Sequence, residues 1–286
     1  MSGVGPPSAN DGARPLAGRA VRPFPLLLLG AGIGAYSTLC GIGGGVFAVP
    51  LLHYAYRMPM RTAVANSLVL VAASTASATL LEGLHAQSAL RLDVVLALVA
   101  GSLVGSLLGF AIGKRVSTAV LKGFFALLLV GVAIQLLVDD SARDVFARGG
   151  AGFEPAAADF AVIAGIGFVA GILAPLLGIG GGLVAVPALL HLAPGLGFLA
   201  ARACSMAMST VAAWQSVWLY RRDGEIRSGA SLWLAGGAVL GAAIGIQLVH
   251  VETVTRAARG LVAFALFFAA ARFAWDLATL RRRTAP

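Results

Sequence analysis

Long apolar runs follow one another along almost the whole chain, and short polar stretches separate them. Each run is about 20 residues or longer, the length that an α-helix needs to cross the hydrocarbon core of a bilayer. The runs lie at residues 24–56, 62–81, 92–112, 119–138, 159–193, 203–220, 229–249 and 257–279. This pattern predicts an all-α polytopic membrane protein.

The composition agrees with that prediction. Hydrophobic residues make up 59% of the 286 residues and charged residues only 12%, whereas soluble domains carry about 25% charged residues. The net charge is +9, but the basic residues lie between the apolar runs and at the chain ends. The positive-inside rule for membrane proteins accounts for this placement. We therefore expect the lipid bilayer as a partner and no nucleic acid.

The sequence contains an internal repeat. The segment Gly41–Pro50 (GIGGGVFAVP) is echoed 137 residues later by 178–187 (GIGGGLVAVP), and Ala65-Asn66-Ser67 is echoed 138 residues later by Ala203-Cys204-Ser205. A ladder of glycines spaced by four also occurs in both halves. The predicted divisions are a flexible cytoplasmic tail at 1–23, membrane repeats at 24–138 and 159–279, an acidic linker at 139–158 and a basic cytoplasmic tail at 280–286.

Three consecutive glycines interrupt the first apolar run of each repeat, and each glycine costs a helix about 1 kcal/mol relative to alanine. The run could cross the membrane straight or turn back as a re-entrant helical hairpin. The hairpin places 15 of the 21 basic residues in the cytoplasm, and straight spans place 13. A hairpin plus three spans per repeat gives inverted-topology repeats, as in many secondary transporters. Both termini are then cytoplasmic.

The glycine breaks are the first candidate site. Non-helical backbone at membrane depth must be buried in protein or line a watery cavity, and the two breaks are expected to meet near the midplane. Amide hydrogens there, with the positive end of a following half-helix, favour an anion. Tight helix packing is the alternative role for these glycines. The candidate residues are Gly43, Gly44, Gly45, Gly180, Gly181 and Gly182.

Short polar side chains at the start of the second run of each repeat extend this site. Asn66 and Ser67, like Cys204 and Ser205, could either cap a helix or hydrogen-bond an oxyanion. Cys40 and Cys204 have no CxxC spacing, so neither a disulfide framework nor a metal site is indicated. No sequence feature indicates a cofactor.

An enzyme is not expected. The sequence has no Gly-x-Ser-x-Gly or HExxH motif and therefore no catalytic residue to assign. Acidic residues such as Glu82 and Asp93 fall near the ends of the apolar runs. A buried carboxylate relay for proton coupling is accordingly not indicated.

The duplicated Gly-Ile-Gly-Gly-Gly followed by Val-Pro, the Ala-x-Ser segment and the Gly-x3-Gly helix together resemble the TauE/SafE family of sulfite and organosulfonate exporters. The resemblance covers nearly the whole chain outside the N-terminal tail and the linker. It implies a small anionic substrate such as sulfite, a sulfonate or thiosulfate. Cys204-Ser205 and Asn66-Ser67 stand where the family usually has a small hydroxyl residue.

The sequence thus predicts a secondary transporter of the bacterial inner membrane that exports a small anion by alternating access around a midplane site. An anion channel and a proton-coupled importer of a sulfur-containing anion are the alternatives. The coupling ion and the oligomeric state stay open, and a homodimer is compatible with the sequence.

Overall fold

The computed structural model describes residues 23–41, 43–84, 88–138, 155–226 and 228–248. The expectations for the N-terminal tail, most of the acidic linker, the last apolar run and the basic C-terminal tail lie outside these residues. All the regular structure in the described residues is helical, with no strand among them. The predicted all-α class is therefore confirmed.

The observed helices follow the predicted runs closely. Those of the first half are α1 (Pro23–Cys40), α2 (Gly45–Pro50), a π-helical turn (Leu51–Ala55), α3 (Met60–Leu84), α4 (Leu92–Arg115) and α5 (Thr118–Val138). Those of the second half are α7 (Ala157–Leu177), α8 (Gly182–Leu192), a short 3-10 turn (Pro194–Leu196), α9 (Gly197–Arg222) and α10 (Ser228–Leu248).

The start of α9 differs from the prediction. The apolar run was expected to begin at residue 203, but α9 begins at Gly197 and includes Arg202. The predicted run began after Arg202 because a charged residue interrupts an apolar pattern. In the structure the Arg202 side chain is only 1% exposed and pairs with Glu82. The ion pair makes the burial of this charge possible, so the helix can extend through it.

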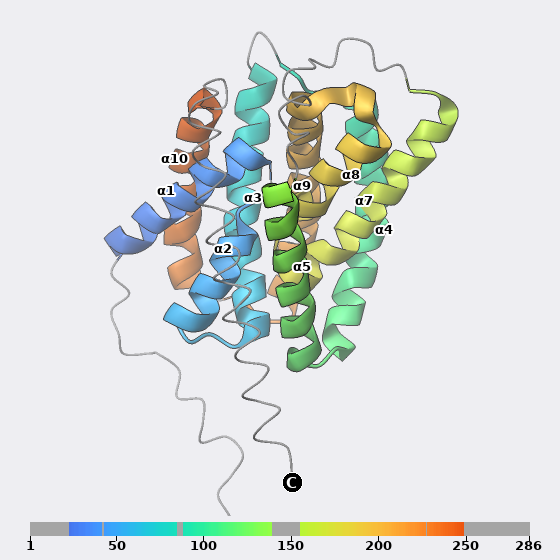
Figure 1. Cartoon of the computed structure of the whole chain (residues 1–286). Helices are drawn as coiled ribbons and strands as arrows, with labels where there is room; N and C mark the ends of the chain where they lie inside the picture. Colours follow the sequence, from blue (N-terminus) through green and yellow to red (C-terminus); the bar gives the residue numbers. More distant parts are fainter. Residues whose placement is uncertain (1–22, 42, 85–87, 139–154, 227, 249–286) are drawn as a thin grey trace, which may run out of the picture.

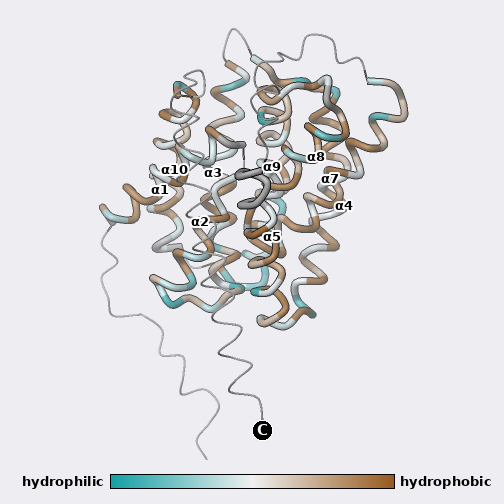
Figure 2. Tube along the Cα trace, in the orientation of Figure 1, coloured by the Kyte–Doolittle hydropathy of each residue, from teal (hydrophilic) through white to brown (hydrophobic). Residues whose placement is uncertain are grey.

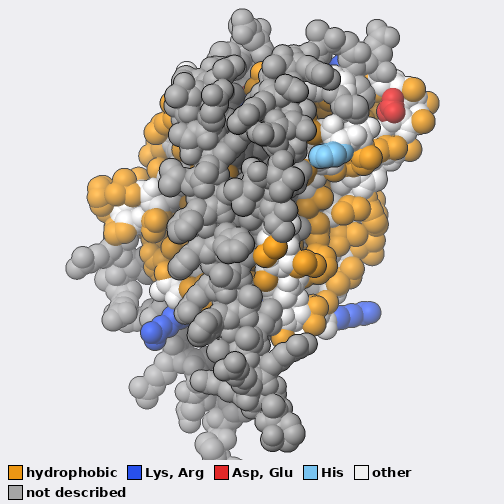
Figure 3. Space-filling model, viewed as in Figure 1, with side chains coloured by type: hydrophobic (Ala, Val, Ile, Leu, Met, Phe, Trp, Pro, Cys, Tyr) orange, Lys and Arg blue, Asp and Glu red, His pale blue; other side chains and the backbone are white. Residues whose placement is uncertain are grey.

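Four of the described helices, α3, α4, α7 and α10, contain a segment long and apolar enough to cross a membrane. Large apolar side chains also cover much of the outer surface, including Leu96 at 68% and Leu103 at 37% exposure. Figure 2 shows brown, hydrophobic stretches along the helices, and Figure 3 shows apolar side chains over most of the coloured surface. So many exposed large apolar side chains suit lipid rather than water. The chain is a multi-pass membrane protein.

Corresponding helices of the two halves run in opposite directions. In Figure 1, α3 begins at the lower end of the bundle and α9, its counterpart in the repeat, begins at the upper end. The ends of α4 and α9 and the starts of α5 and α10 also lie at the lower end. The first helix of each half lies beside a long helix of the other half, α1 beside α10 and α7 beside α4 (Figure 1).

Glycine ladders make these two helix pairs, α1 with α10 and α4 with α7, very close. A Cβ atom added at Gly101 would lie 1.9 Å from the Ala164 carbonyl oxygen, and one at Gly241 would lie 1.9 Å from that of Ala31. Real Cβ contacts are never that short, so a larger residue would force the backbones apart. The ladders have the helix-packing role expected for glycines spaced by four.

Adjacent glycines on α10 allow a matched test of this packing. A Cβ atom at Gly237 would lie 2.1 Å from the Leu27 carbonyl oxygen, whereas one at Gly236 would meet nothing within 4 Å. We expect Gly237→Ala to lower the free energy of unfolding by about 1–3 kcal/mol because of overpacking. Gly236→Ala should leave it unchanged or raise it by up to about 1 kcal/mol through better helix propensity. Thermal unfolding in detergent would compare them, and equal melting temperatures would contradict the packing role.

Candidate functional site

The glycine motif breaks the helix in both halves. After α1, Gly41, Gly43 and Gly44 have φ angles of +72°, +88° and +71°. After α7, the corresponding glycines 178, 180 and 181 have φ angles of +72°, +83° and +86°. Residues with a side chain rarely adopt these angles. The triple-glycine segments are therefore true turns, and α2 and α8 begin anew after them.

The two breaks lie against each other. A Cβ atom at Gly45 would lie 1.9 Å from the Gly178 carbonyl oxygen, and one at Gly182 would lie 2.5 Å from the Gly41 carbonyl oxygen. Between these two contacts, a Cβ atom at Gly43 would lie 2.6 Å from the Ile179 carbonyl oxygen. The segments thus run antiparallel with backbone touching backbone. All six predicted glycines belong to the two segments in contact.

Each break is followed by the first turn of a helix, where the first amide groups lack the carbonyl acceptor that the rest of the helix provides. In α8 the amides of Val184 and Ala185 donate to the Gly181 carbonyl oxygen, at 3.2 and 3.1 Å. Within the described part of the chain, no hydrogen bond is formed by the preceding Leu183 amide. α8 has 11 residues, so its dipole adds positive potential at this point.

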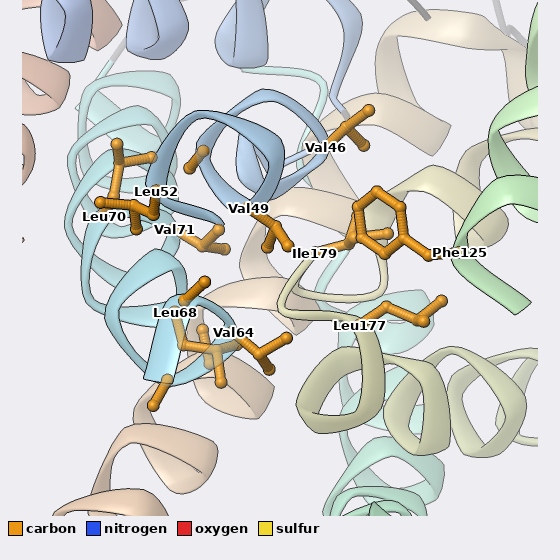
Figure 4. Packing of buried hydrophobic residues seen from close by; sticks show 14 of the residues in the cluster. Val46, Val49, Leu52, Val64, Leu68, Leu70, Val71, Phe125, Leu177 and Ile179 are labelled. Atoms are coloured by element: carbon orange, nitrogen blue, oxygen red, sulfur yellow. The ribbon is translucent and has the colours of Figure 1, made fainter. Parts of the chain in front are cut away.

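Apolar side chains enclose the contact. Val49 of α2, Val64 of α3 and the pair Leu177 and Ile179 around the second break belong to one buried cluster, each at most 2% exposed. Figure 4 shows Leu177 and Ile179 facing the α2 and α3 side chains, with Phe125 of α5 beside them. Low-dielectric surroundings strengthen any interaction of an ion with the amides.

Two serines hold the breaks together across the halves. The Ser67 hydroxyl of α3 donates to the Gly178 carbonyl oxygen at 2.9 Å, and the Ser205 hydroxyl of α9 donates to the Gly41 carbonyl oxygen at 3.4 Å. Ser67 also contacts its own helix through the Val64 carbonyl oxygen. Each serine therefore binds the break of the other half. Both are fully buried.

Asn66 and Cys204, the other predicted site residues, contact connecting loops instead. Asn66 donates to the Thr62 and Glu225 carbonyl oxygens at 2.6 and 3.4 Å, which links α3 to the loop after α9. Cys204 accepts from the Arg91 amide at 3.4 Å, which links α9 to the loop before α4. The structure thus brings the two serines to the glycine breaks, whereas these hydrogen bonds of Asn66 and Cys204 lead to connecting loops.

A serine pair on α3 tests the cross-half bond. Ser67→Ala leaves the buried Gly178 carbonyl without this donor, and we expect a loss of about 1–3 kcal/mol in the free energy of unfolding. Ser74 is equally buried, but its hydroxyl donates to its own helix, at the Val71 carbonyl oxygen. Ser74→Ala should therefore change stability by a few tenths of a kcal/mol. Melting temperatures that fall equally in both variants would contradict the linking role of Ser67.

Three further polar residues lie beside the breaks. The Ser209 hydroxyl is buried and would be 3.2 Å from a Cβ atom at Gly182. Ser37 of α1 is likewise buried, next to Gly44, and neither hydroxyl has a hydrogen-bond partner in the described ranges. Arg202 touches the first break, because a Cβ atom at Gly41 would lie 2.7 Å from its Cγ atom. Sequence reasoning missed Ser37 and Arg202, although an arginine directly before an apolar run was a usable signal.

Comparisons with known proteins find one family and several named relatives. The family model described as sulfite exporter TauE/SafE matches residues 6–136 and 163–286. A relative from Haemophilus influenzae, named a probable membrane transporter protein, is 29% identical over 57% of this chain and 59% of its own length. A Xylella fastidiosa protein of the same name is 32% identical over 36% of this chain and 40% of its own length.

The probable membrane transporter protein MamO of Magnetospirillum gryphiswaldense is 32% identical over 40% of this chain. The match spans only 19% of MamO, and the chain covers less than two thirds of each of these three relatives. No solved structure matches the chain. The family model, in contrast, matches both halves, each including its glycine break. The chain belongs to the TauE/SafE family of membrane transporters.

Proposed function

We propose that this protein exports a small anion, sulfite or an organosulfonate, by alternating access around the contact between the two glycine breaks. The observation that carries the proposal is the antiparallel contact of Gly41–Gly45 with 178–182, where two helices begin. An anion can reach the amide groups only when the two segments separate, because their backbones touch. Binding and movement of the halves are thus coupled.

The relation between the halves supports this mechanism. Ser67 binds Gly178 and Ser205 binds Gly41. The two bonds are equivalent under the repeat, because each serine and each glycine occupies the position that corresponds to the other. Helices α3 and α9 run oppositely, as inverted repeats require (Figure 1). Two such halves have two equivalent ways of tilting against each other. One opens the site to one side of the membrane and the other opens it to the opposite side.

The distribution of charge supports a cytoplasmic position for the lower end in Figure 1. Basic residues gather there on the ends of several helices, as the positive-inside rule requires of cytoplasmic loops. They are Arg57, Arg61, Lys114, Arg115, Lys122, Arg221 and Arg222. We therefore propose that this multi-pass protein lies in the bacterial inner membrane with both termini in the cytoplasm.

Export of an anion needs no coupling ion in this orientation. An inside-negative potential favours the outward movement of each negative charge by about 2.3 kcal/mol per 100 mV. Uptake would have to overcome the same free energy. The buried carboxylate of Glu82 favours one alternative, a proton-coupled importer of a sulfur-containing anion. The tight contact of the breaks argues against an open anion channel.

Transport by the purified protein in liposomes would test the proposal. We expect saturable efflux of radiolabelled sulfite that accelerates when a potassium gradient with valinomycin makes the interior negative. Gly181→Leu should abolish it, because Gly181 has a φ of +86° and a Cβ atom there would lie 2.7 Å from the Ala170 carbonyl oxygen. Gly165→Leu is the control, since a Cβ atom at Gly165 meets nothing within 4 Å.

Three outcomes would count against the proposal. Strictly inward, proton-driven uptake would favour the importer. A flux that does not saturate would favour a channel. Normal transport by Gly181→Leu, with the protein inserted at the usual level, would remove the glycine breaks from the transport mechanism.

A further inference from the structure

A buried ion pair joins the two halves at the end of the bundle where α3 ends and α9 begins, the upper end in Figure 1. Arg202 in the second turn of α9 binds Glu82, near the end of α3, with 2.5 Å between Nη2 and Oε2. The two side chains are 1% and 8% exposed. A buried ion pair is seldom worth more to stability than apolar residues of similar volume. Stability alone therefore does not explain why this ion pair is present.

The repeat shows that this pair replaces a simpler contact. At the other end of the bundle, the Tyr220 hydroxyl donates to the Pro175 carbonyl oxygen at 2.9 Å, three residues before the second break. Tyr220 follows Glu82 by 138 residues and Pro175 follows Thr38 by 137, the offsets of the repeat. The carbonyl oxygen of Thr38 accepts from Arg202 Nη1 at 3.1 Å. At the lower end, a neutral tyrosine thus binds the carbonyl oxygen before the break directly. At the upper end, the corresponding carbonyl oxygen is bound by the arginine of a charged pair.

The guanidinium group also keeps an unused donor. Arg202 Nε is buried and has no hydrogen-bond partner among the described residues, which is costly for a charged group unless a ligand uses it. Arg202, Ser205 and Ser209 are spaced i, i+3 and i+7, so they share one face of α9. The hydroxyls of both serines face Gly182, and that of Ser209 forms no hydrogen bond within the part of the chain that the structure describes. A row of donors therefore leads from the second break to Arg202.

We propose that Arg202 is the charged anion-binding group of this exporter and that Glu82 occupies it until the anion displaces that carboxylate. This inference rests on the proposed function. The planar guanidinium can bind a sulfite or sulfonate group through two parallel hydrogen bonds, as it binds a carboxylate. The anion passes from the amides of the breaks, past Ser209, to Arg202 on the exit side.

Glu82 is placed to leave. It lies two residues before the end of α3, and its Oε1 already accepts from the Ala89 amide in the loop before α4, at 3.4 Å. When the anion takes the guanidinium, the carboxylate can turn toward this loop and the water beyond it. The buried charge then remains balanced, because one anion has replaced another. Return of Glu82 to Arg202 expels the anion and resets the empty transporter.

Transport kinetics of charge variants in liposomes would test this assignment with radiolabelled sulfite as the probe. Glu82→Gln removes the competing charge, so the KM for sulfite should fall several-fold. The double variant Glu82→Gln with Arg202→Gln leaves no unpaired charge, but its KM should rise at least about tenfold because a charge-assisted bond is lost. Arg202→Lys with Glu82 retained should also raise the KM, since lysine lacks the planar fork.

The pair Arg91 and Asp93 provides the control at the same end of the molecule. Its atoms are 2.7 Å apart and both side chains are 34% exposed. The change Arg91→Gln with Asp93→Asn removes the same charges, and the KM should stay within about twofold because exposed pairs contribute little.

The outcomes separate this inference from the proposed function. If the wild-type protein transports no sulfite or organosulfonate probe, the proposed export function and the role of Arg202 are both wrong. If it transports sulfite and the double variant keeps the wild-type KM, the role of Arg202 is wrong and the proposed export function is retained. If the double variant fails to insert in the membrane, the KM of Glu82→Gln is the deciding measurement. An unchanged KM in that variant would show that Glu82 does not compete with the anion for Arg202.

Discussion

Replacing Gly45 with alanine is expected to abolish anion transport and to lower the free energy of unfolding by about 3 kcal/mol or more. Gly45 begins α2 and has no positive φ angle, so alanine suits its backbone conformation. Alanine is excluded because backbone atoms of the other half occupy the space that its methyl group would need. Its Cβ atom would lie 1.9 Å from the Gly178 carbonyl oxygen and 2.6 Å from the Ile179 Cα atom, which are backbone atoms with little room to move.

Two further glycines make this a graded experiment. Gly182→Ala places the Cβ atom 2.5 Å from the Gly41 carbonyl oxygen and should cost less than Gly45→Ala. Gly32 on α1 is exposed and has nothing within 4 Å, so Gly32→Ala should transport normally. Sulfite efflux and thermal unfolding in detergent would be measured for all three. Normal efflux by Gly45→Ala would show that close contact of the breaks is dispensable.

The second large effect is expected at Arg202. Arg202→Met leaves the Glu82 carboxylate buried without its partner, and we expect it to lower the free energy of unfolding by about 3–5 kcal/mol. Adding Glu82→Gln removes the uncompensated charge. The double variant should therefore recover most of the loss, although neither change restores the ion pair. Thermal unfolding of the wild type, both single variants and the double variant gives the coupling between the sites.

Additive effects would contradict this expectation, because two independent sites give the sum of their separate losses. The exposed pair of Lys114 and Asp223, with atoms 2.7 Å apart, is a suitable reference. Breaking it with Lys114→Met should cost at most about 1 kcal/mol. A loss of similar size at Arg202 would mean that burial does not set the energy of the Glu82 pair.

Local chemistry made much of the fold predictable. The apolar runs gave the described helices to within a few residues at most ends, because helices are the simplest way to satisfy backbone hydrogen bonds in lipid. The triple glycines marked the breaks for a similar local reason, since the turn requires positive φ angles. The glycine ladders indicated close helix packing, and α4 against α7 shows it.

The site was only partly predictable. Ser67 and Ser205 were recognised as polar positions of the repeat, but their partners, Gly178 and Gly41, depend on which half each helix faces. Asn66 and Cys204 occupy neighbouring positions in the sequence and yet contact the connecting loops. A step of one residue turns a helical side chain by about 100°, so neighbours point to different surroundings. Only the packing of the helices shows which of them faces a break.

The amino-acid sequence by itself determined the family, the helical membrane architecture and the positions of the glycine breaks, because each is written in the identity and order of neighbouring residues. The tertiary structure decided which residues meet. Glu82 and Arg202 are 120 positions apart, and in the sequence each resembles an ordinary charge near the end of an apolar run. Their burial as a pair follows from the opposite directions of α3 and α9, which bring the end of one helix beside the start of the other.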